Sequence, residues 1–293
     1  MTITVTPQPS GFGAHISGVD LSVPLDARAK AELVAAWAAH GVIAFPDQKL
    51  SLEAQEAFTL ALGAFGEDPF VKPMPGHAHI LELRREPDET APNFGSGWHS
   101  DWSFQATPPS ATILHAKVIP PVGGDTLFAD CTAAFAALSP AMQKLCSGLN
   151  AVHSARLPYG RDGAYANETG TRTMQIITGE AAEGTQIHPL VRVHPLTGQP
   201  ALYCSPTYTI GLEGMTSDEG YAILGFLFKH ITQPQFIYRH HWAPDMLLMW
   251  DNRRMLHFAE GGYDGHLRLL HRTTVAGEAP IAASQLQPKA AAA

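Results

Sequence analysis

His99 and Asp101 stand two residues apart in the segment GWHSDWSF, residues 97 to 104. If this segment is a strand, side chains at positions i and i+2 point to the same face, so an imidazole nitrogen and a carboxylate oxygen can converge on one point. A metal ion can occupy that point, and so can a water molecule or a direct hydrogen bond. The pair therefore indicates a candidate metal site and leaves the alternatives open.

His257, in the segment MLLMWDNRRMLHFAEGG, is the candidate for a third ligand. Two histidines and one carboxylate can bind one face of a metal ion and leave its other positions open, which is the arrangement of non-haem Fe(II) oxygenases. Arg268 and Arg272 follow in the segment LRLLHR. Arginine presents a planar fork that binds a carboxylate through two hydrogen bonds. This set predicts a site that binds a metal ion together with an organic acid.

Four segments in this order, WHSD, GGDTLFAD, WDNRRMLH and LRLLHRTT, resemble the taurine dioxygenase and 2,4-dichlorophenoxyacetate dioxygenase (TauD/TfdA) family. The similarity covers nearly the whole chain. It implies an Fe(II)- and 2-oxoglutarate-dependent dioxygenase with a double-stranded β-helix (jelly-roll) core. It also implies that His99, Asp101 and His257 bind iron, that Thr126 and Arg268 hold the distal carboxylate of 2-oxoglutarate, and that O₂ takes the remaining open position.

The reaction that the resemblance implies is hydroxylation of a substrate C–H bond, with 2-oxoglutarate converted to succinate and CO₂. Hydroxylation next to a heteroatom gives an unstable product, so cleavage of a C–O, C–S or C–N bond is expected. Related halogenases replace the carboxylate ligand with a small residue. Because this chain keeps Asp101, hydroxylation is predicted. Arg272 matches the family position that faces the acidic group of the substrate, which predicts a small carboxylate or sulfonate.

Taurine itself is not the predicted substrate. Gly95 stands where taurine-specific members have an asparagine, and a glycine has no side chain that could hydrogen-bond an amine. Lys72 stands where they have a histidine, and it is predicted either as a second cationic contact to the substrate or as a solvated loop residue. Phe104, with Phe70 and Tyr159, is predicted to line the substrate site.

Two other classes of protein remain open at this point. A cupin-like isomerase or hydrolase could use the same three ligands without Thr126 and Arg268 poised for a dicarboxylate. A non-catalytic protein that binds anions or metal could use the same scaffold. Against the second alternative, a degenerate site usually loses a ligand, and this chain keeps all three.

The other histidines are predicted to be structural. His188 and His194 each precede a proline and alternate with apolar residues, which is typical of strand ends. His240 and His241 are adjacent and must face opposite ways in a strand, so at most one of them can reach a site. His271 is predicted to pack on the side opposite to its neighbouring arginine.

Local patterns predict the elements that position these residues. Asp26 and Ser51 are helix-capping residues that predict helices over 27–40 and 52–65, the second ended by Gly66. Trp250 and Asn252 are predicted to support the strand and turn before His257. Gly123 and Gly124 are predicted to shape a turn before Thr126. Strands are predicted over 42–46, 79–83, 111–119, 125–131, 188–195, 201–205, 236–242, 245–251 and 267–277.

Many short strands with turn signals between them predict a sandwich or barrel, into which helices over 129–148 and 217–231 are inserted. Residues 155–185 are polar and Gly-rich, which predicts a long mobile loop and a candidate lid. The chain is therefore predicted as a single domain, 1–293, of the α+β class, with a mainly β, jelly-roll core flanked by helices. A flexible tail is predicted from about residue 284.

The composition limits the partners and the compartment. The 293 residues are 45% hydrophobic and 16% charged, which is typical of a globular protein. The net charge of −8 argues against binding to nucleic acids or anionic membranes. Three cysteines without regular spacing, together with no signal-peptide pattern and no long apolar run, predict a cytoplasmic protein without a membrane span. The family resemblance implies a homo-oligomer, a dimer or a tetramer.

Overall fold

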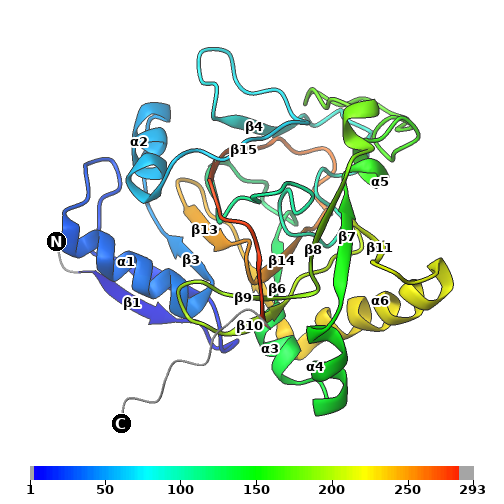
Figure 1. Cartoon of the computed structure of the whole chain (residues 1–293). Coiled ribbons are helices and arrows are strands. Elements are labelled where there is room, and N and C mark those ends of the chain that lie inside the picture. The colour runs from blue at the N-terminus through cyan, green and yellow to red at the C-terminus, as the bar shows by residue number, and fades with distance from the viewer. Residues whose placement is uncertain (1–2, 284–293) are drawn as a thin grey trace, which may run out of the picture.

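A seven-stranded sheet forms the largest layer of the computed structural model, which describes residues 3–283 (Figure 1). Neighbouring strands are antiparallel except for one parallel pair, β2 and β3. In spatial order the strands are β1 (Thr4–Pro7), β2 (Ala14–Ser17), β3 (Val42–Phe45), β13 (Leu247–Asp251), β5 (Ala111–Val118), β15 (Arg268–Val275) and β4 (Leu81–Arg85).

Three smaller antiparallel sheets, each of three strands, complete the β structure. The first has the order β12 (Ile237–His240), β6 (Thr126–Asp130), β14 (Met255–Ala259), and it carries one of the candidate ligands. The second has the order β11 (Thr209–Leu212), β7 (Asn150–Ser154), β8 (Thr185–Pro189), and the third β10 (Pro200–Leu202), β9 (Val191–Val193), β16 (Ile281–Ala282).

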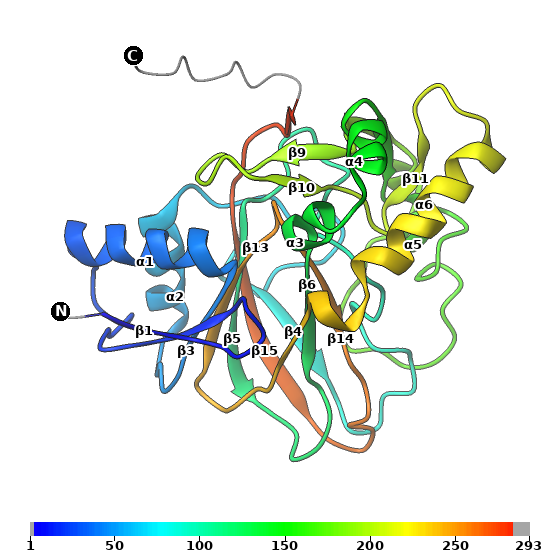
Figure 2. The same cartoon turned by 90° about the horizontal axis from the view of Figure 1, so that it is seen from below.

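The central strands of the main sheet, including β13, are buried on both faces, which explains why the sequence of β13 is almost continuously apolar. Leu247 and Met249 pack with the helices α1 (Ala27–His40) and α2 (Leu52–Leu62). Leu248 and Trp250 belong to a second apolar cluster, with residues of β6, β12 and β14. Figure 2 shows α1 and α2 on one side of the main sheet, and α3, α4 and α6 on the opposite side of the molecule.

The first two helices begin as predicted. The side chain of Asp26 accepts a hydrogen bond from the backbone of Ala29, and that of Ser51 accepts one from Ala54. The predicted end of α2 at Gly66 is wrong, because the helix closes at Gly63. The chain has already turned toward the sheet at Gly66, whose N–H donates to the carbonyl of Thr274 in β15 at 2.9 Å.

The single helix predicted over 129–148 is two short helices, α3 (Cys131–Ala136) and α4 (Pro140–Ser147). Ser139 caps α4, and Pro140 stands at its first position, where the missing N–H of proline does no harm. A proline in the interior of one long helix would have removed a hydrogen bond. The helix predicted over 217–231 is confirmed as α6 (Ser217–Ile231), with a capping box formed by Thr216 and Glu219.

The eight predicted strands after residue 67 correspond to observed strands, but several others were not predicted. His257 follows shortly after the apolar strand β13, as predicted, and itself lies inside one of the unpredicted strands, β14. The segment predicted as a loop over 155–185 contains a short helix, α5 (Arg156–Tyr159), and a 3-10 turn, Glu180–Ala182. Another 3-10 turn is Pro234–Phe236. The predicted tail from 284 lies outside the described residues. The unpredicted strands are β1, β2, β7, β11, β14 and β16.

The overall class is therefore a mixed α/β fold rich in β-sheet, as predicted. No helix within residues 3–283 has the length and apolar character that crossing a bilayer requires.

Candidate metal centre

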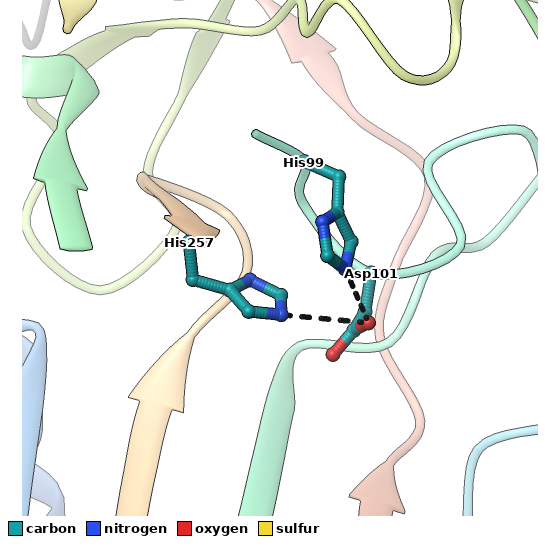
Figure 3. Close-up of side chains that lie close together, drawn as sticks. All are labelled: His99, Asp101 and His257. Atoms are coloured by element: carbon teal, nitrogen blue, oxygen red, sulfur yellow. Dashed lines mark ion pairs between the residues drawn. The ribbon is translucent and has the colours of Figure 1, made fainter. Parts of the chain in front are cut away.

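His99, Asp101 and His257 converge on one point, as Figure 3 shows. One nitrogen of each imidazole and one carboxylate oxygen lie within 4.8 Å of one another, and all three residues are buried. The Nε2 atoms of His99 and His257 lie 3.6 Å and 3.9 Å from Oδ1 of Asp101. Among the described residues this is the one group of three or more such ligands that could hold a metal ion.

The backbone holds the two histidines opposite each other. The N–H of His99 donates to the carbonyl of His257 at 3.1 Å, and the N–H of His257 donates to the carbonyl of His99 at 2.7 Å. This isolated bridge attaches the segment of His99 to the edge of β14. The expectation that His99 and Asp101 lie in one strand is wrong, because the chain turns at Asp101 and Trp102 has a positive φ of 46°.

Both imidazoles can present a free lone pair at Nε2. The Nδ1–H of His99 donates to the carbonyl of Gly97 at 2.6 Å, which fixes the tautomer that leaves Nε2 as an acceptor. Burial, assisted by the neighbouring His99, lowers the pKa of His257 to about 3, so this imidazole is neutral at physiological pH. Neutral imidazole is the form that binds metal ions.

Asp101 is held in its ionised form. Burial opposes its charge, but Arg272 and the two histidines more than offset this cost and hold the pKa of the carboxyl well below its usual range. The Thr112 hydroxyl donates to Oδ2 of Asp101 at 2.5 Å, while Oδ1 faces the histidines. Asn252 donates to the Thr112 oxygen at 2.9 Å, so the carboxylate is fixed through β5 and the turn after β13.

A cavity opens beside the candidate ligands, and the two residues expected to bind 2-oxoglutarate line it. Thr126 at the start of β6 and Arg268 at the start of β15 both line it, and both are buried. Arg268 donates from Nη2 to the carbonyl of Gly124 at 3.2 Å, whereas its buried Nε has no partner. The cavity walls are Leu83, Arg84, Arg85, Glu89, Phe94, Gly95, His99, Leu114, Thr126, Arg172, Met174, Trp250, His257, Ala259, Tyr263, Arg268 and Arg272.

Arg272 also lines this cavity, but carboxylates of the protein already surround its guanidinium. Nη2 forms an ion pair with Asp68, and Nη1 lies 3.5 Å from Oδ1 of Asp101. The guanidinium lies over the ring of Trp102, 4.9 Å from its centre, and the indole N–H of Trp102 also donates to Asp68. Asp68 was not predicted as a site residue, although it lies two residues before Phe70 and four before Lys72 in a stretch considered for substrate contacts.

A second cavity, of about 510 Å³, meets the first at Phe94, Gly95 and His99. One wall is formed by residues 92–97, and the other by Leu157–Thr169 of the segment predicted as a lid. Tyr159, which the sequence predicted as lining, is part of this wall. Gly95, at the position where an asparagine would narrow the site, has a positive φ of 77°.

The other predicted substrate contacts lie elsewhere. Lys72 is exposed and lines a separate hollow with Glu82 and Gln175. Its neighbour Val71 is buried, and successive side chains of an extended segment point to opposite sides, so Lys72 faces away. Phe104 does not border either of the first two cavities, and it packs behind Tyr208 at a ring distance of 5.1 Å.

Five other histidines have structural partners. The Nε2 atoms of His188 and His194 lie 2.9 Å from the carbonyl of Gln105 and 2.8 Å from Asp251, respectively. His240 is buried while its neighbour His241 is exposed, as the strand geometry predicted. His271 is buried on the side of Glu82, at 3.9 Å. His153, for which no role was predicted, lies 3.0 Å from the Ser103 hydroxyl.

The supporting residues behave as expected. The indole N–H of Trp250 donates to the Asn252 side chain at 3.0 Å, and Asn252 in turn supports Thr112. Gly123 and Gly124 both have positive φ, and a side chain at Gly123 would collide with the backbone of Gly262, 2.5 Å away. The glycines are therefore required by the turn that leads to Thr126.

The fold and the site define a sheet-rich α/β protein with two histidines and a carboxylate around an open cavity. The family model "Taurine catabolism dioxygenase TauD, TfdA family" matches residues 4–274. The chain belongs to the TauD/TfdA family.

Individual relatives agree with this assignment. The alpha-ketoglutarate-dependent sulfate ester dioxygenase of Pseudomonas putida is 31% identical over 282 residues, which cover 96% of this chain and 92% of the relative. The alpha-ketoglutarate-dependent 2,4-dichlorophenoxyacetate dioxygenase of Cupriavidus pinatubonensis is 32% identical, with 96% and 100% covered. The crystal structure of a taurine dioxygenase from Burkholderia xenovorans superposes with a TM-score of 0.81 at 31% identity, covering 98% of this chain and 94% of that one.

Proposed function

We propose that the protein is an Fe(II)- and 2-oxoglutarate-dependent dioxygenase that hydroxylates a small organic anion and releases succinate and CO₂. The observation that carries this proposal is that His99 and His257, which converge with Asp101 as candidate metal ligands, border the same cavity as Arg268, a buried arginine whose Nε has no partner. The names of the relatives support the same activity, since they are alpha-ketoglutarate-dependent enzymes acting on sulfate esters and aryloxyacetates.

The donor set fits a non-haem iron ion. His99, Asp101 and His257 would hold it through two neutral imidazoles and one carboxylate, the ligand set of Fe(II) oxygenases with open positions. When bound, the iron supplies the activation of O₂ that the side chains of the protein cannot perform. The chain contributes ligands whose direction is fixed by Gly97, Thr112 and the bridge between the two histidines.

We infer that Arg268 and Thr126 bind the distal carboxylate of 2-oxoglutarate. Arg268 is buried and has an unpartnered Nε, so a bidentate carboxylate would satisfy a group that is otherwise costly to bury. The Thr126 oxygen accepts a hydrogen bond from the Trp242 indole at 3.0 Å and can donate its own hydrogen to the same carboxylate. A cupin-like isomerase or hydrolase with the same three ligands would not need Thr126 and Arg268 to bind the distal carboxylate of a dicarboxylate.

The primary substrate is proposed to occupy the second cavity. Its walls include Phe94, Tyr159 and Tyr165, which favour an alkyl or aryl body, and its junction with the first cavity at His99 exposes that body to the metal centre. We infer that residues 155–185 act as the lid over this cavity and that Arg272 meets the acidic group. Hydroxylation beside a heteroatom would then lead to C–O, C–S or C–N cleavage.

The remaining proposals concern the architecture. We infer that the main sheet and the β12-β6-β14 sheet are the two halves of a jelly roll, since the apolar cluster around Phe128 and Trp250 packs between them. A single domain over 1–293, a cytoplasmic location and a dimeric or tetrameric assembly stay predictions.

Succinate formation tests the activity. Purified protein with Fe(II), ascorbate and O₂ should release succinate from 2-oxoglutarate, and the rate should rise with one class among sulfonates, sulfate esters, aryloxyalkanoates and amino acids. The His257→Ala protein, assayed in parallel, should release none. Metal binding without any succinate, across the whole panel, would contradict the dioxygenase and favour a non-oxidative enzyme.

A further inference from the structure

The arginines around the first cavity differ in one respect, which is whether a carboxylate of the protein already neutralises them. Arg85 pairs with Asp264 at 3.0 Å, and Arg84 and Arg172 pair with glutamates at 2.5 Å and 2.6 Å. Arg272 pairs with Asp68 and Asp101. Among the cavity-lining arginines within residues 3–283, Arg268 alone has no carboxylate oxygen within 4.0 Å.

The second cavity offers no cation of its own. No lysine or arginine belongs to its described walls, and its one charged residue is Glu168, which is bound to Arg172. If Arg268 holds 2-oxoglutarate, Arg272 is the arginine proposed to meet an acidic group on the primary substrate; it lines the first cavity together with His99, which borders both cavities. That arginine already has two carboxylates beside it, and a third would be repelled by both.

The two carboxylates that contact Arg272, those of Asp68 and Asp101, differ in how firmly the surrounding structure holds them. Asp101 is almost fully buried, bonded to Thr112 and aligned with the two histidines, so it cannot leave without dismantling the metal centre. Asp68 lies in the irregular stretch between α2 and β4 and is partly accessible. Its partners are the side chains of Arg272, Trp102 and Thr274. Asp68 is therefore the carboxylate that can be exchanged.

We propose that Asp68 is the resident counter-ion of Arg272 and that the acidic group of the primary substrate takes its place, which makes Asp68 a specificity-determining residue. This inference rests on the proposed function. A sulfate, sulfonate or carboxylate can bind the guanidinium as Asp68 does, whereas a neutral substrate cannot compete for it. Asp68 thus lowers the affinity for an anionic ligand, which must displace it from Arg272, and leaves the affinity for a neutral ligand unchanged, because that ligand binds without breaking the ion pair.

The test is the Asp68→Asn variant, which keeps an acceptor for Trp102 and removes the charge. Hexyl sulfate and phenoxyacetate are the anionic probes and 1-hexanol is the neutral one, with binding measured by calorimetry on protein loaded with Mn(II) and 2-oxoglutarate, where no turnover occurs. The variant should bind an anionic probe about tenfold more tightly than the wild type, with the binding of hexanol unchanged.

Asp264→Asn is the matched control, because it removes a carboxylate from Arg85, another arginine of the same cavity. It should leave the affinities as they are in the wild type. Equal gains in both variants would show a general charge effect and overturn the proposal. It is also overturned if Asp68→Asn brings no gain, including the case in which neither protein binds an anionic probe.

Trp102 gives a second readout that does not depend on the folding of the Asp68 variant. Displacement of Asp68 removes the hydrogen-bond acceptor of this indole, so hexyl sulfate should change the tryptophan emission of the wild type, and Trp102→Phe should abolish the change. An identical response in both proteins would contradict the exchange. Succinate release by the wild type tests the dioxygenase separately, so failure of one proposal is distinguishable from failure of the other.

Discussion

Asp101 shows how a buried charge is made useful at the level of a single residue. A lone buried carboxylate would take up a proton, but here Arg272 and Thr112 stabilise the ionised form. The hydroxyl of Thr112 also stops the carboxylate from rotating, so that Oδ1 stays directed at the two histidines. The orientation of a metal ligand thus depends on a residue that does not touch the metal.

Thr112→Val should weaken metal binding without unfolding the protein. The valine has the same shape, but it leaves Oδ2 of Asp101 and the Asn252 amide each without a partner. Loss of such an outer hydrogen bond lowers metal affinity by about 10- to 100-fold. Titration with Co(II), followed by its visible absorption, measures this change. Thr112→Ser keeps the hydroxyl and should stay near wild type, and equal affinities for the valine and serine proteins would refute the role of the hydroxyl.

Arg268→Gln should raise the concentration of 2-oxoglutarate needed for half-maximal binding, by about two orders of magnitude, because a charged bidentate contact is replaced by a single neutral one. Metal affinity should be unaffected, since Arg268 has no contact with the three ligands. The measurement is the visible charge-transfer band formed anaerobically with Fe(II). Arg239→Gln, an exposed arginine paired with Glu260, is the control. An unchanged requirement in Arg268→Gln would reject the assignment.

The site residues that could be predicted from the sequence are those that lie in recognisable motifs. The predicted ligands and 2-oxoglutarate contacts lie in segments with family-like spacing. The structure brings His99, Asp101 and His257 together, and the two histidines line one cavity with Thr126 and Arg268. Thr112, Asn252 in its bonding role, and Asp68 could not be found in this way. Their function arises from contacts across 11 to 204 positions of sequence, which no local pattern encodes.

At the scale of elements, the strands with apolar runs and the helices with polar caps were predicted, because both signals are local. The break between α3 and α4 was missed although Ser139-Pro140 marks it, since apolar residues continue across the boundary. Strands such as β7 and β11 were missed because they are short and mix polar with apolar side chains. Their stability comes from pairing with distant strands.

Gly123→Ala should destabilise the turn that leads from Gly123 to β6. The residue has a φ of 67°, and an added Cβ would lie 2.5 Å from the carbonyl oxygen of Gly262. The free energy of unfolding should fall by about 2 kcal/mol or more, and the affinity for 2-oxoglutarate should fall as Thr126 shifts. Urea denaturation measures the first effect. Gly184→Ala, where no atom lies within 4 Å of the new Cβ, is the control and should be near neutral.

At the scale of the whole molecule, the strands near the candidate metal centre and the 155–185 segment have different roles. Strand β14 carries His257 and strand β15 carries Arg268 and Arg272, both with buried, closely paired backbones, while His99 and Asp101 lie in a segment attached to β14 by the bridge between the two histidines. The 155–185 segment carries few regular elements and forms one wall of the second cavity. Paired strands therefore hold His257 and the arginines, while a segment with few regular elements forms a wall of the cavity that is proposed for the substrate.

The buried histidines make the stability of the whole fold depend on pH. Burial lowers the pKa of His153 and of His240 from 6.5 to about 3, with His188 and His15, respectively, adding to the effect. The unfolded chain binds protons at these sites below pH 6.5 and the folded chain does not. Through these groups the free energy of unfolding should therefore change little above about pH 7.5 and fall by up to about 1.4 kcal/mol per pH unit for each histidine between pH 6 and pH 4.

His240→Gln should remove the contribution of one buried histidine and flatten the slope by that amount, because glutamine does not titrate and can still bond to the Tyr238 hydroxyl. The slope is obtained from urea denaturation of the metal-free protein at several pH values. His241→Gln removes an exposed neighbour and should change the slope much less than His240→Gln does. If His240→Gln and His241→Gln change the slope equally, burial of His240 is not the cause, and the proton uptake on unfolding must come from other groups.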